Sequence, residues 1–447
     1  MKNVLKINKK IKSFNKKIEV SGDKSLSIRW ILFSSISNKK CFAKNLLISE
    51  DVLATINAIK KLGIKVHRKD STCTIYGKGI DGYTYKKNLV INAKNSGTLA
   101  RLLPGLLIDT PYPIKIIGDN SLSKRDFKRI AEPLSKFGAK FKLKNNKGLP
   151  LIINGTKNLK PIKYFEKRGS AQCKSSVIFG GLKTKGTTTI IAKKSRDHTE
   201  LLCKYLRLPI KIIKKKKYDI INISKINKIK NLNYKIPSDI SSSAFFIVLA
   251  VLSSNSKLLI RNVNINPSRI GIVKILRKMN IKINFKNTKA YKGEKNADIE
   301  IKSPKKIKAI NCPSSLNSGA IDEFLVIFLM AAKANGISYF KGLAELNKKE
   351  SPRLKWGSVI LNKMGIKNIT TNNSIKIFGN PNLKIRKKIV IKNYLKDHRV
   401  FMTSVIAALS FGGSWNIDDS QSIKTSFPDF LKIINRLKDD DKEKKNN

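Results

Sequence analysis

One local pattern, the passage from a helix into a strand, recurs along this sequence and limits what the chain can fold into. The segments INAIKKLGIKV, AEPLSKFGAKFKL, VKILRKMNIKI and VILNKMGIKNI each combine helical spacing of apolar residues with a short alternating strand. Between the two parts stand Gly63, Gly138, Asn280 and Gly365, residue types that tolerate the left-handed conformation in which helices commonly end. A degenerate copy, LCKYLRLPIKI, lies between the copies at Gly138 and Asn280. The chain is therefore expected to repeat one α/β unit.

The spacing of these slots, roughly 70–85 residues, exceeds the periods of about 20–50 residues that are typical of solenoids. Each repeat is therefore expected to be a whole α/β subdomain, with strands such as KNLVINA, PIKIIGD and TTTIIAK between its helices. The predicted fold class is α/β (α+β), built by duplication. Because any α/β protein contains junctions of this kind, the pattern alone also allows an unrepeated sheet.

The charge balance is strongly basic, with 92 Lys and Arg against 30 Asp and Glu and a formal net charge of +62 over 447 residues. Nucleic-acid binding is one interpretation of such a charge, and attraction of anionic substrates is another. The lysines are scattered among many Ile and Asn residues, which a bias towards AT-rich codons also produces. Because no RNA-binding motif with interleaved aromatic residues occurs, we expect no specific nucleic-acid partner. Dense positive charge should self-repel, so a monomer is expected.

The expected location is a reducing cytoplasm. The five cysteines are widely spaced without a C-x-x-C pair, so neither a disulfide framework nor a zinc site is expected. The first 17 residues contain no apolar segment of the kind found in signal peptides. The longest apolar run, Phe324 to Ala332, is far short of the ~20 residues needed to span a bilayer. No membrane association is expected.

The segment SGDKSLSIRW, residues 21–30, has some features of a phosphate-binding loop. A Walker loop requires glycine directly before its lysine, whereas Asp23 precedes Lys24 and the upstream glycine is missing. If a helix begins near Lys24, then Ser25 and Arg29 lie on one face at its positive N-terminus. The segment therefore predicts a site for an anion smaller than a nucleoside triphosphate.

Polar and cationic residues precede several other predicted helices. Asp322 and Glu323 stand before an apolar run, where helix capping is a structural alternative to catalysis. Such helix starts from both halves of the chain would together suit a ligand with several negative groups. The segments concerned are NSGTLARLL, GDNSLSKRDFKRIAEPL, RGSAQCKSSVIFGGL, SRDHTELL, AIDEFLVIFLMAA, KGLAELNKKESPRLKWGSVIL and KDHRVFMTSVIAAL.

Ten motifs, taken in their order and spacing, resemble those of the 5-enolpyruvylshikimate-3-phosphate (EPSP) synthase family, the 3-phosphoshikimate 1-carboxyvinyltransferases. The resemblance runs from about residue 18 to residue 437, almost the whole chain. The motifs are GDKSLSIR, NSGTLARLL, SLSKRDFKRIAEPL, GSAQCKSS, SRDHTE, PSDISSSAFF, IDEF, AELNKKESPRL, DHR and TSFPDF.

The resemblance implies two similar domains, each of three βαβαββ repeats, in the inside-out α/β barrel of the enolpyruvyl transferases. Residues 1–20 and 239–447 would form one domain and residues 21–238 the other, with the active site in the cleft between them. The implied reaction transfers the enolpyruvyl group of phosphoenolpyruvate to the 5-hydroxyl of shikimate-3-phosphate, through a tetrahedral intermediate. Neither a metal nor an organic cofactor is implied, and glyphosate is expected to compete with phosphoenolpyruvate.

The resemblance also implies roles for individual residues. Lys24 would contact both substrates. Asp322 would bind shikimate-3-phosphate and take the proton from its 5-hydroxyl, and Glu350 would move a proton to and from the methylene carbon of phosphoenolpyruvate. The other residues implied to hold shikimate-3-phosphate are Ser25, Arg29, Ser170, Ala171, Gln172, Ser195, Arg196 and Lys349, and those implied to hold phosphoenolpyruvate are Gly97, Arg125, Gln172, Arg353 and Arg399.

The sequence departs from the family pattern at three positions. Pro352 replaces an Asp in the KESPR motif, which removes a carboxylate near Arg353 and leaves the direction of that guanidinium open. Lys94 replaces a glycine before NSGT, and Thr425 stands where some members have lysine.

Three other functions stay open at this level. One is UDP-N-acetylglucosamine enolpyruvyl transfer, although the cysteine of that family is missing from GDNSLSKRD. The others are a basic nucleic-acid-binding protein and, because of Pro352, an enzyme that has lost its activity. His398 lies beside Arg399, and a packing or supporting role is expected for it rather than acid–base work.

Overall fold

The computed structural model describes residues 3–438, which divide into two compact units. The unit that we call the N-unit contains Gly22–Ile236 and Tyr291–Glu294. The C-unit contains residues 3–21, Pro237–Ala290 and residues 295–438. Sequence analysis did not anticipate that the short segment Tyr291–Glu294 groups with the N-unit.

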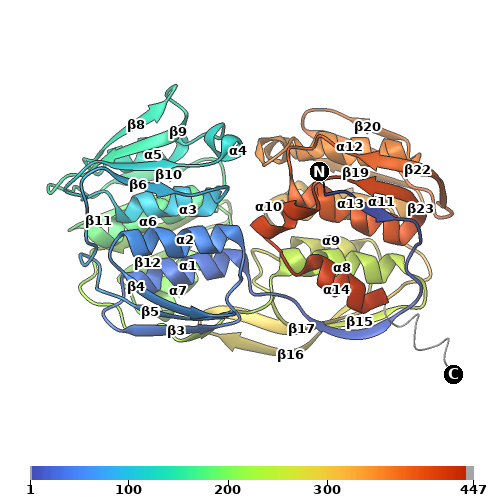
Figure 1. The fold of residues 1–447 in the computed structure, drawn as a ribbon, viewed down its shortest axis with the longest axis horizontal. Coiled ribbons are helices and arrows are strands. Elements are labelled where there is room, and N and C mark those ends of the chain that lie inside the picture. Colours follow the sequence, from blue (N-terminus) through green and yellow to red (C-terminus); the bar gives the residue numbers. More distant parts are fainter. Residues whose placement is uncertain (1–2, 439–447) are drawn as a thin grey trace. The chain divides into compact units, whose positions relative to one another are not determined.

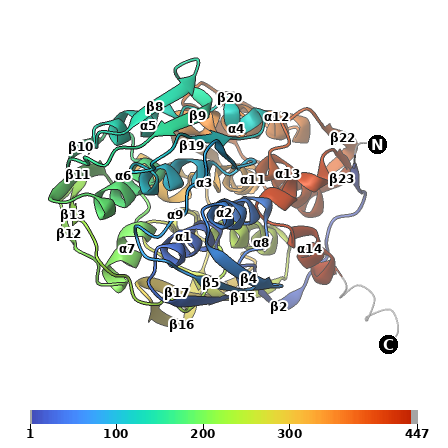
Figure 2. The same ribbon diagram turned by 60° about the vertical axis from the view of Figure 1, so that its left-hand side comes forward.

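The described part of the N-unit contains three four-stranded sheets that share one topology (Figures 1 and 2). Each sheet has two parallel strands on one side. The other two strands form an antiparallel hairpin, and the later strand of that hairpin pairs with the inner strand of the parallel pair. The sheets are β14 (Tyr234–Lys235), β3 (Lys40–Lys44), β5 (Thr72–Tyr76) and β4 (Lys65–Lys69); β6 (Leu89–Asn92), β7 (Ile114–Ile117), β9 (Gly148–Asn154) and β8 (Lys140–Lys144); and β10 (Lys163–Glu166), β11 (Thr187–Lys193), β13 (Tyr218–Ser224) and β12 (Ile210–Lys214).

The C-unit repeats this arrangement in two four-stranded sheets and one three-stranded sheet. In the three-stranded sheet, β1 from the start of the chain pairs with the central strand in place of a hairpin. The sheets are β2 (Asn15–Glu19), β15 (Lys257–Asn264), β17 (Glu294–Lys302) and β16 (Ile283–Tyr291); β18 (Asn311–Cys312), β19 (Ile337–Lys341), β21 (Ser374–Phe378) and β20 (Asn368–Thr370); and β22 (Ile385–Ile391), β23 (Gly412–Ile417) and β1 (Leu5–Ile7).

The expected fold of two similar α/β domains, each of three βαβαββ repeats, is confirmed by these sheets. Within residues 3–438, however, no sheet closes on itself, so the sheets surround the helices without a hydrogen-bonded barrel. Strand β2 is the first strand of a repeat whose next helix begins only at Ile240. The N-unit is therefore inserted into the first repeat of the C-unit.

Helices fill the inside of each unit (Figures 1 and 2). The helices of the N-unit are α1 (Lys24–Ser35), α2 (Glu50–Lys61), α3 (Gly97–Leu102), α4 (Asn120–Ser123), α5 (Lys128–Ser135), α6 (Ala171–Lys183) and α7 (His198–Tyr205). Those of the C-unit are α8 (Ile240–Leu252), α9 (Gly271–Lys278), α10 (Asn317–Ala320), α11 (Phe324–Lys333), α12 (Arg353–Met364), α13 (His398–Phe411) and α14 (Phe430–Lys438).

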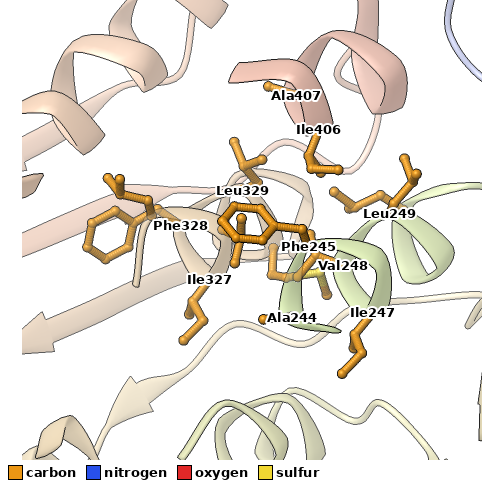
Figure 3. Close-up of a cluster of buried hydrophobic side chains, with 14 of the residues drawn as sticks. Ala244, Phe245, Ile247, Val248, Leu249, Ile327, Phe328, Leu329, Ile406 and Ala407 are labelled. Atoms are coloured by element: carbon orange, nitrogen blue, oxygen red, sulfur yellow. The ribbon is translucent and has the colours of Figure 1, made fainter. Parts of the chain in front are cut away.

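The central helices are buried on all sides. Every residue of α8 is buried, and in α11 only the terminal Lys333 is partly exposed. Side chains of α8, α11 and α13 interlock in the core of the C-unit, with Phe245, Phe328 and Ile406 among them (Figure 3). No helix among the described residues is long and apolar enough to cross a membrane.

The predicted left-handed helix exits are confirmed. Gly63, Gly138, Asn280 and Gly365 have φ values of 81°, 109°, 66° and 84°. The degenerate copy follows the same path, because Arg207 has a φ of 54°. In four of the five copies the next residue's amide donates to the carbonyl five residues back, as in Ile64 to Ile59 at 3.1 Å. This hydrogen bond is the Schellman motif, which satisfies carbonyls at the helix end.

We predict that Gly365→Ala lowers the free energy of unfolding of the C-unit by about 1 kcal/mol, because alanine is strained at positive φ. A Cβ atom at Gly365 would have no described heavy atom within 4 Å, so packing does not contribute to this loss. The matched control is Gly365→Asn, which should lose less because Asn280 occupies the same slot. Equal urea-unfolding midpoints for the two variants would contradict the explanation.

Candidate active site

The candidate residues of the N-unit stand at the starts of its helices. Helix α1 begins at Lys24, as predicted, and the Asp23 carboxylate accepts a hydrogen bond from the Leu26 amide at 2.8 Å. Gly22 is required by close packing, because a Cβ atom there would lie 2.0 Å from the Asn45 carbonyl oxygen. The glycine of this motif therefore serves backbone packing, and the segment is not a loop that wraps a triphosphate.

Lys24 and Arg29 on α1 are held by side chains of other helices. The Lys24 ammonium lies 3.0 Å from Asp51 on α2. Arg29 is only 3% exposed; its Nε donates to Thr199 Oγ1 at 2.8 Å, and its Nη1 donates to the Ser25 carbonyl at 3.1 Å. The structure thus brings Arg29 beside Ser25 and against the first turn of α7.

A second group of candidates surrounds the start of α3. A Cβ atom on Gly97 would lie 3.1 Å from Arg125 Nη1 and 3.5 Å from Arg101 Nη1, so two guanidinium groups flank this backbone. Arg101 also donates to Gln172 Oε1 at 2.6 Å, and Gln172 donates to Thr98 Oγ1 at 3.0 Å. Gly97, Arg125 and Gln172, predicted from separate motifs, therefore meet at one place, together with Arg101.

The remaining candidates of the N-unit precede α6 and α7. Ser170 caps α6 by accepting from the Cys173 amide at 3.3 Å, and Ala171 is the first residue of that helix. Ser195 and Arg196 lie just before α7. The Ser195 hydroxyl oxygen is buried and makes no hydrogen bond within the described part of the chain.

In the C-unit, the candidates gather around the guanidinium of Arg353. This side chain is 3% exposed and lies in a ring of carboxylates. Its Nε donates to Asp397 Oδ2 at 2.8 Å and its Nη2 to Asp397 Oδ1 at 3.2 Å. Nη2 also pairs with Glu350, and Nη1 lies 3.4 Å from Asp322.

The opposite charges of Arg353 and Asp397 stabilise each other's ionised forms. Burial favours the neutral form of Asp397, but the Arg353 guanidinium outweighs that effect and holds the carboxyl pKa below its ordinary value. Burial likewise opposes the charge of Arg353, yet Asp397 and Glu350 raise its pKa. Arg353 and Asp397 are therefore both ionised near neutral pH.

Asp322 and Glu350, the two proposed proton carriers, lie on opposite sides of Arg353. Lys349 donates to Asp322 Oδ1 at 3.1 Å. Asp322 is 18% exposed and Glu350 17%, so both carboxylates remain accessible. Glu323 is the N-cap residue of α11, but its side chain makes no capping hydrogen bond and accepts instead from the Ser241 hydroxyl. Capping therefore does not account for Glu323.

Arg399 lies in the first turn of α13. It is 7% exposed, donates to the Ser241 carbonyl at 3.1 Å and stacks on the Phe245 ring at 5.5 Å. This hydrogen bond to Ser241 holds the Arg399 side chain against the start of α8.

The proline of the KESPR motif does not leave Arg353 without a partner. Pro352 stands at the N-cap of α12, and the helix begins with the Trp356 amide donating to its carbonyl at 3.0 Å. The preceding Ser351 donates to Asp397 Oδ2 at 2.8 Å. Asp397 therefore holds both Ser351 and Arg353 without a carboxylate at position 352.

Sequence reasoning assigned no role to two residues that position these candidates. Asp397 belongs to the DHR motif and precedes an apolar helix, the same signal that singled out Asp322, but the sequence does not show its partner. Arg101 stands four residues after Gly97, on the same helical face. His398 Nδ1 lies 3.2 Å from Thr425 Oγ1.

The fold matches that of solved enolpyruvyl transferases. The EPSP synthase of Acinetobacter baumannii aligns with a TM-score of 0.86 and 33% identity, covering 97% of this chain and 98% of that one. The enolpyruvyl transferase NikO of Streptomyces tendae aligns with a TM-score of 0.76 over 98% of both chains, and its 13% identity supports the fold alone. This chain therefore has the fold of the enolpyruvyl transferases.

The sequence shows which family of enolpyruvyl transferases the chain belongs to. Residues 8–434 match the family model for EPSP synthase (3-phosphoshikimate 1-carboxyvinyltransferase). The 3-phosphoshikimate 1-carboxyvinyltransferase of Ruthia magnifica is 38% identical over 94% of each chain, and that of Petrotoga mobilis is 34% identical over 95% of this chain and 98% of the relative. The chain belongs to the EPSP synthase family. Membership makes it a transferase of the shikimate pathway that transfers the enolpyruvyl group of phosphoenolpyruvate.

We predict that Asp397→Asn destabilises the C-unit by about 3–5 kcal/mol at neutral pH, because the variant removes the buried carboxylate that meets two nitrogens of the Arg353 guanidinium. Because the folded pKa of Asp397 is lowered, this difference is full above the ordinary carboxyl pKa of 3.8 and declines as the pH falls towards the lowered folded value.

The measurement is urea unfolding of both proteins from pH 7 down to pH 3. Ser351→Ala is the control, since it removes one hydrogen bond to the same carboxylate and should cost only about 1 kcal/mol. A deficit for Asp397→Asn that grows as the pH falls would contradict the ion-pair account.

Proposed function

We propose that this chain joins phosphoenolpyruvate to the 5-hydroxyl of shikimate-3-phosphate, releasing 5-enolpyruvylshikimate-3-phosphate and inorganic phosphate. The observation that carries the proposal is the pair of accessible carboxylates, Asp322 and Glu350, on either side of Arg353. Proton transfer is the chemistry that such a pair provides.

The cations at the helix starts match the charge of these substrates. Each substrate carries one phosphate and one carboxylate, so the site must neutralise four anionic groups. At an effective dielectric constant near 20, one opposite charge at about 4 Å contributes roughly 4 kcal/mol. Arginine suits carboxylates and phosphates because its planar fork donates two parallel hydrogen bonds.

We assign the residues of the N-unit to the two substrates as follows. Arg29 and Ser25 bind shikimate-3-phosphate, and Lys24 contacts both substrates. Arg125 binds phosphoenolpyruvate where Gly97 leaves room for it. The further residues proposed to hold shikimate-3-phosphate are Ser170, Ala171, Gln172, Ser195 and Arg196, and Gln172 also reaches phosphoenolpyruvate.

In the C-unit, Lys349 binds shikimate-3-phosphate, and Arg353 and Arg399 bind phosphoenolpyruvate. Two nitrogens of Arg353 are held by Asp397, whereas Nη1 lies 3.4 Å from Asp322. That nitrogen can exchange its contact for a substrate carboxylate without disturbing the buried pair.

The reaction then proceeds in two steps. Asp322 takes the proton from the 5-hydroxyl, whose oxygen forms a bond with C2 of phosphoenolpyruvate while Glu350 gives a proton to C3. In the second step Glu350 removes a proton from C3, the C2–O bond to phosphate breaks, and the double bond returns. Lys24 and the arginines stabilise the negative charge that develops on the phosphate oxygens.

We also propose that the chain acts as a monomer in the cytoplasm. The net charge of +62 favours mutual repulsion between copies. All five cysteines are buried free thiols, which suits a reducing compartment. Glyphosate is proposed to compete with phosphoenolpyruvate.

We predict that Asp322→Ala and Glu350→Gln each lower kcat by about 10²–10⁴-fold, because each removes a proton carrier. The measurement is phosphate release from shikimate-3-phosphate and phosphoenolpyruvate. Glu345→Gln is the matched control, since Glu345 lies in the same segment, pairs with Lys348 and is 45% exposed. Full turnover by either active-site variant would refute the assigned roles.

We predict that Gly97→Ala raises the KM for phosphoenolpyruvate by about tenfold and leaves the KM for shikimate-3-phosphate nearly unchanged. The new Cβ atom would lie 3.1 Å from Arg125 Nη1 and would displace the guanidinium. A shift of this size corresponds to the loss of one good contact to a charged group. Steady-state kinetics with each substrate varied in turn tests the assignment, which an equal rise in both KM values would contradict.

A further inference from the structure

A buried hydrogen bond joins the first residue of α7 to a segment about 100 positions later in the chain. The His198 Nδ1 lies 2.6 Å from Glu294 Oε1, and both side chains are 0% exposed. Glu294 belongs to the tip of the β16–β17 hairpin, Tyr291–Glu294, which groups with the N-unit although the rest of the hairpin lies in the C-unit sheet. Neither residue is among those assigned to the substrates.

The hairpin tip contacts helix α7 and the segment around strand β14. A Cβ atom on Gly293, whose φ is 87°, would lie 2.7 Å from the Leu201 carbonyl oxygen of α7. The Tyr291 hydroxyl accepts from the Lys235 amide at 2.9 Å, and the Lys292 ammonium donates to the Asn233 carbonyl. Several contacts therefore hold the tip against the N-unit, and the contact between Glu294 and His198 is the one that reaches the start of α7.

The first turn of α7 in turn contacts residues that are assigned to shikimate-3-phosphate. Thr199, next to His198, accepts from Arg29 Nε at 2.8 Å and bonds the Ser175 hydroxyl at 2.7 Å. Ser195 and Arg196 immediately precede the same turn. A shift of the start of α7 would therefore move Arg29 and the Ser195–Arg196 pair together.

We propose that His198 and Glu294 are positioning residues for shikimate-3-phosphate: their buried pair sets the start of α7, and α7 sets Arg29, Ser195 and Arg196. The inference rests on the proposed function, since it concerns how that substrate is held. A buried hydrogen bond suits this task better than an apolar contact, because its partners must meet at hydrogen-bonding distance and cannot slide past one another without leaving a buried polar group unsatisfied.

Selectivity between the two substrates distinguishes positioning from general stability. We expect Glu294→Gln and His198→Gln each to raise the Kd for shikimate-3-phosphate by about tenfold, the effect of misplacing one charged hydrogen bond. The KM for phosphoenolpyruvate should stay unchanged. Calorimetric titration with shikimate-3-phosphate and steady-state kinetics with phosphoenolpyruvate provide the two values, and two variants are used so that the failure of one to fold does not end the test.

Tyr291→Phe is the matched control, because it removes a hydrogen bond from the same tip without touching the pair, and it should leave both values unchanged. Combining Glu294→Gln with Thr199→Val should cost little more than either change alone, since both act through Arg29.

An equal rise in both values, or unchanged binding of shikimate-3-phosphate by both variants, would overturn the positioning role. Failure of the wild-type chain to bind shikimate-3-phosphate would instead overturn the proposed function itself.

Discussion

A helix that is buried on every side can place polar side chains at low energetic cost only near its ends, where backbone N–H groups need partners and solvent is closest. The central helices of both units face this constraint. Helix α8 carries its serines in the first turn and is apolar afterwards, and α11 is apolar throughout until Lys333. The polar chemistry of the chain is therefore collected at helix starts, where N–H groups and the helix dipole already favour anions.

The cations at these helix starts are held by protein partners in the structure. Lys24 pairs with Asp51, Lys349 with Asp322, and Arg353 with Asp397. Binding of an anionic substrate consequently exchanges one set of charge pairs for another, and the net gain is smaller than each isolated attraction suggests. The advantage of this arrangement is geometric, because the cations are already oriented when the substrate arrives.

Much of the fold could be predicted because its signals are local. The left-handed exits at Gly63 and Asn280 follow from residue type and helical spacing, and the start of α1 at Lys24 follows from its motif. Arg207 adopts the same conformation without such a signal, since arginine is ordinarily disfavoured at positive φ. The pairs Arg353–Asp397 and His198–Glu294 join residues 44 and 96 positions apart, and no local pattern specifies which distant carboxylate meets which partner. For the same reason the doubt about Pro352 could be settled only by three-dimensional contacts.

The central claim is that the carboxylate of Glu350 carries a proton to and from the methylene carbon of phosphoenolpyruvate. Proton NMR of the vinyl group during turnover in D2O with shikimate-3-phosphate tests it directly. The account predicts that deuterium enters the vinyl position of the product with the wild-type chain and that Glu350→Gln loses this incorporation. Product formed by the wild-type chain without deuterium at that position would contradict the account.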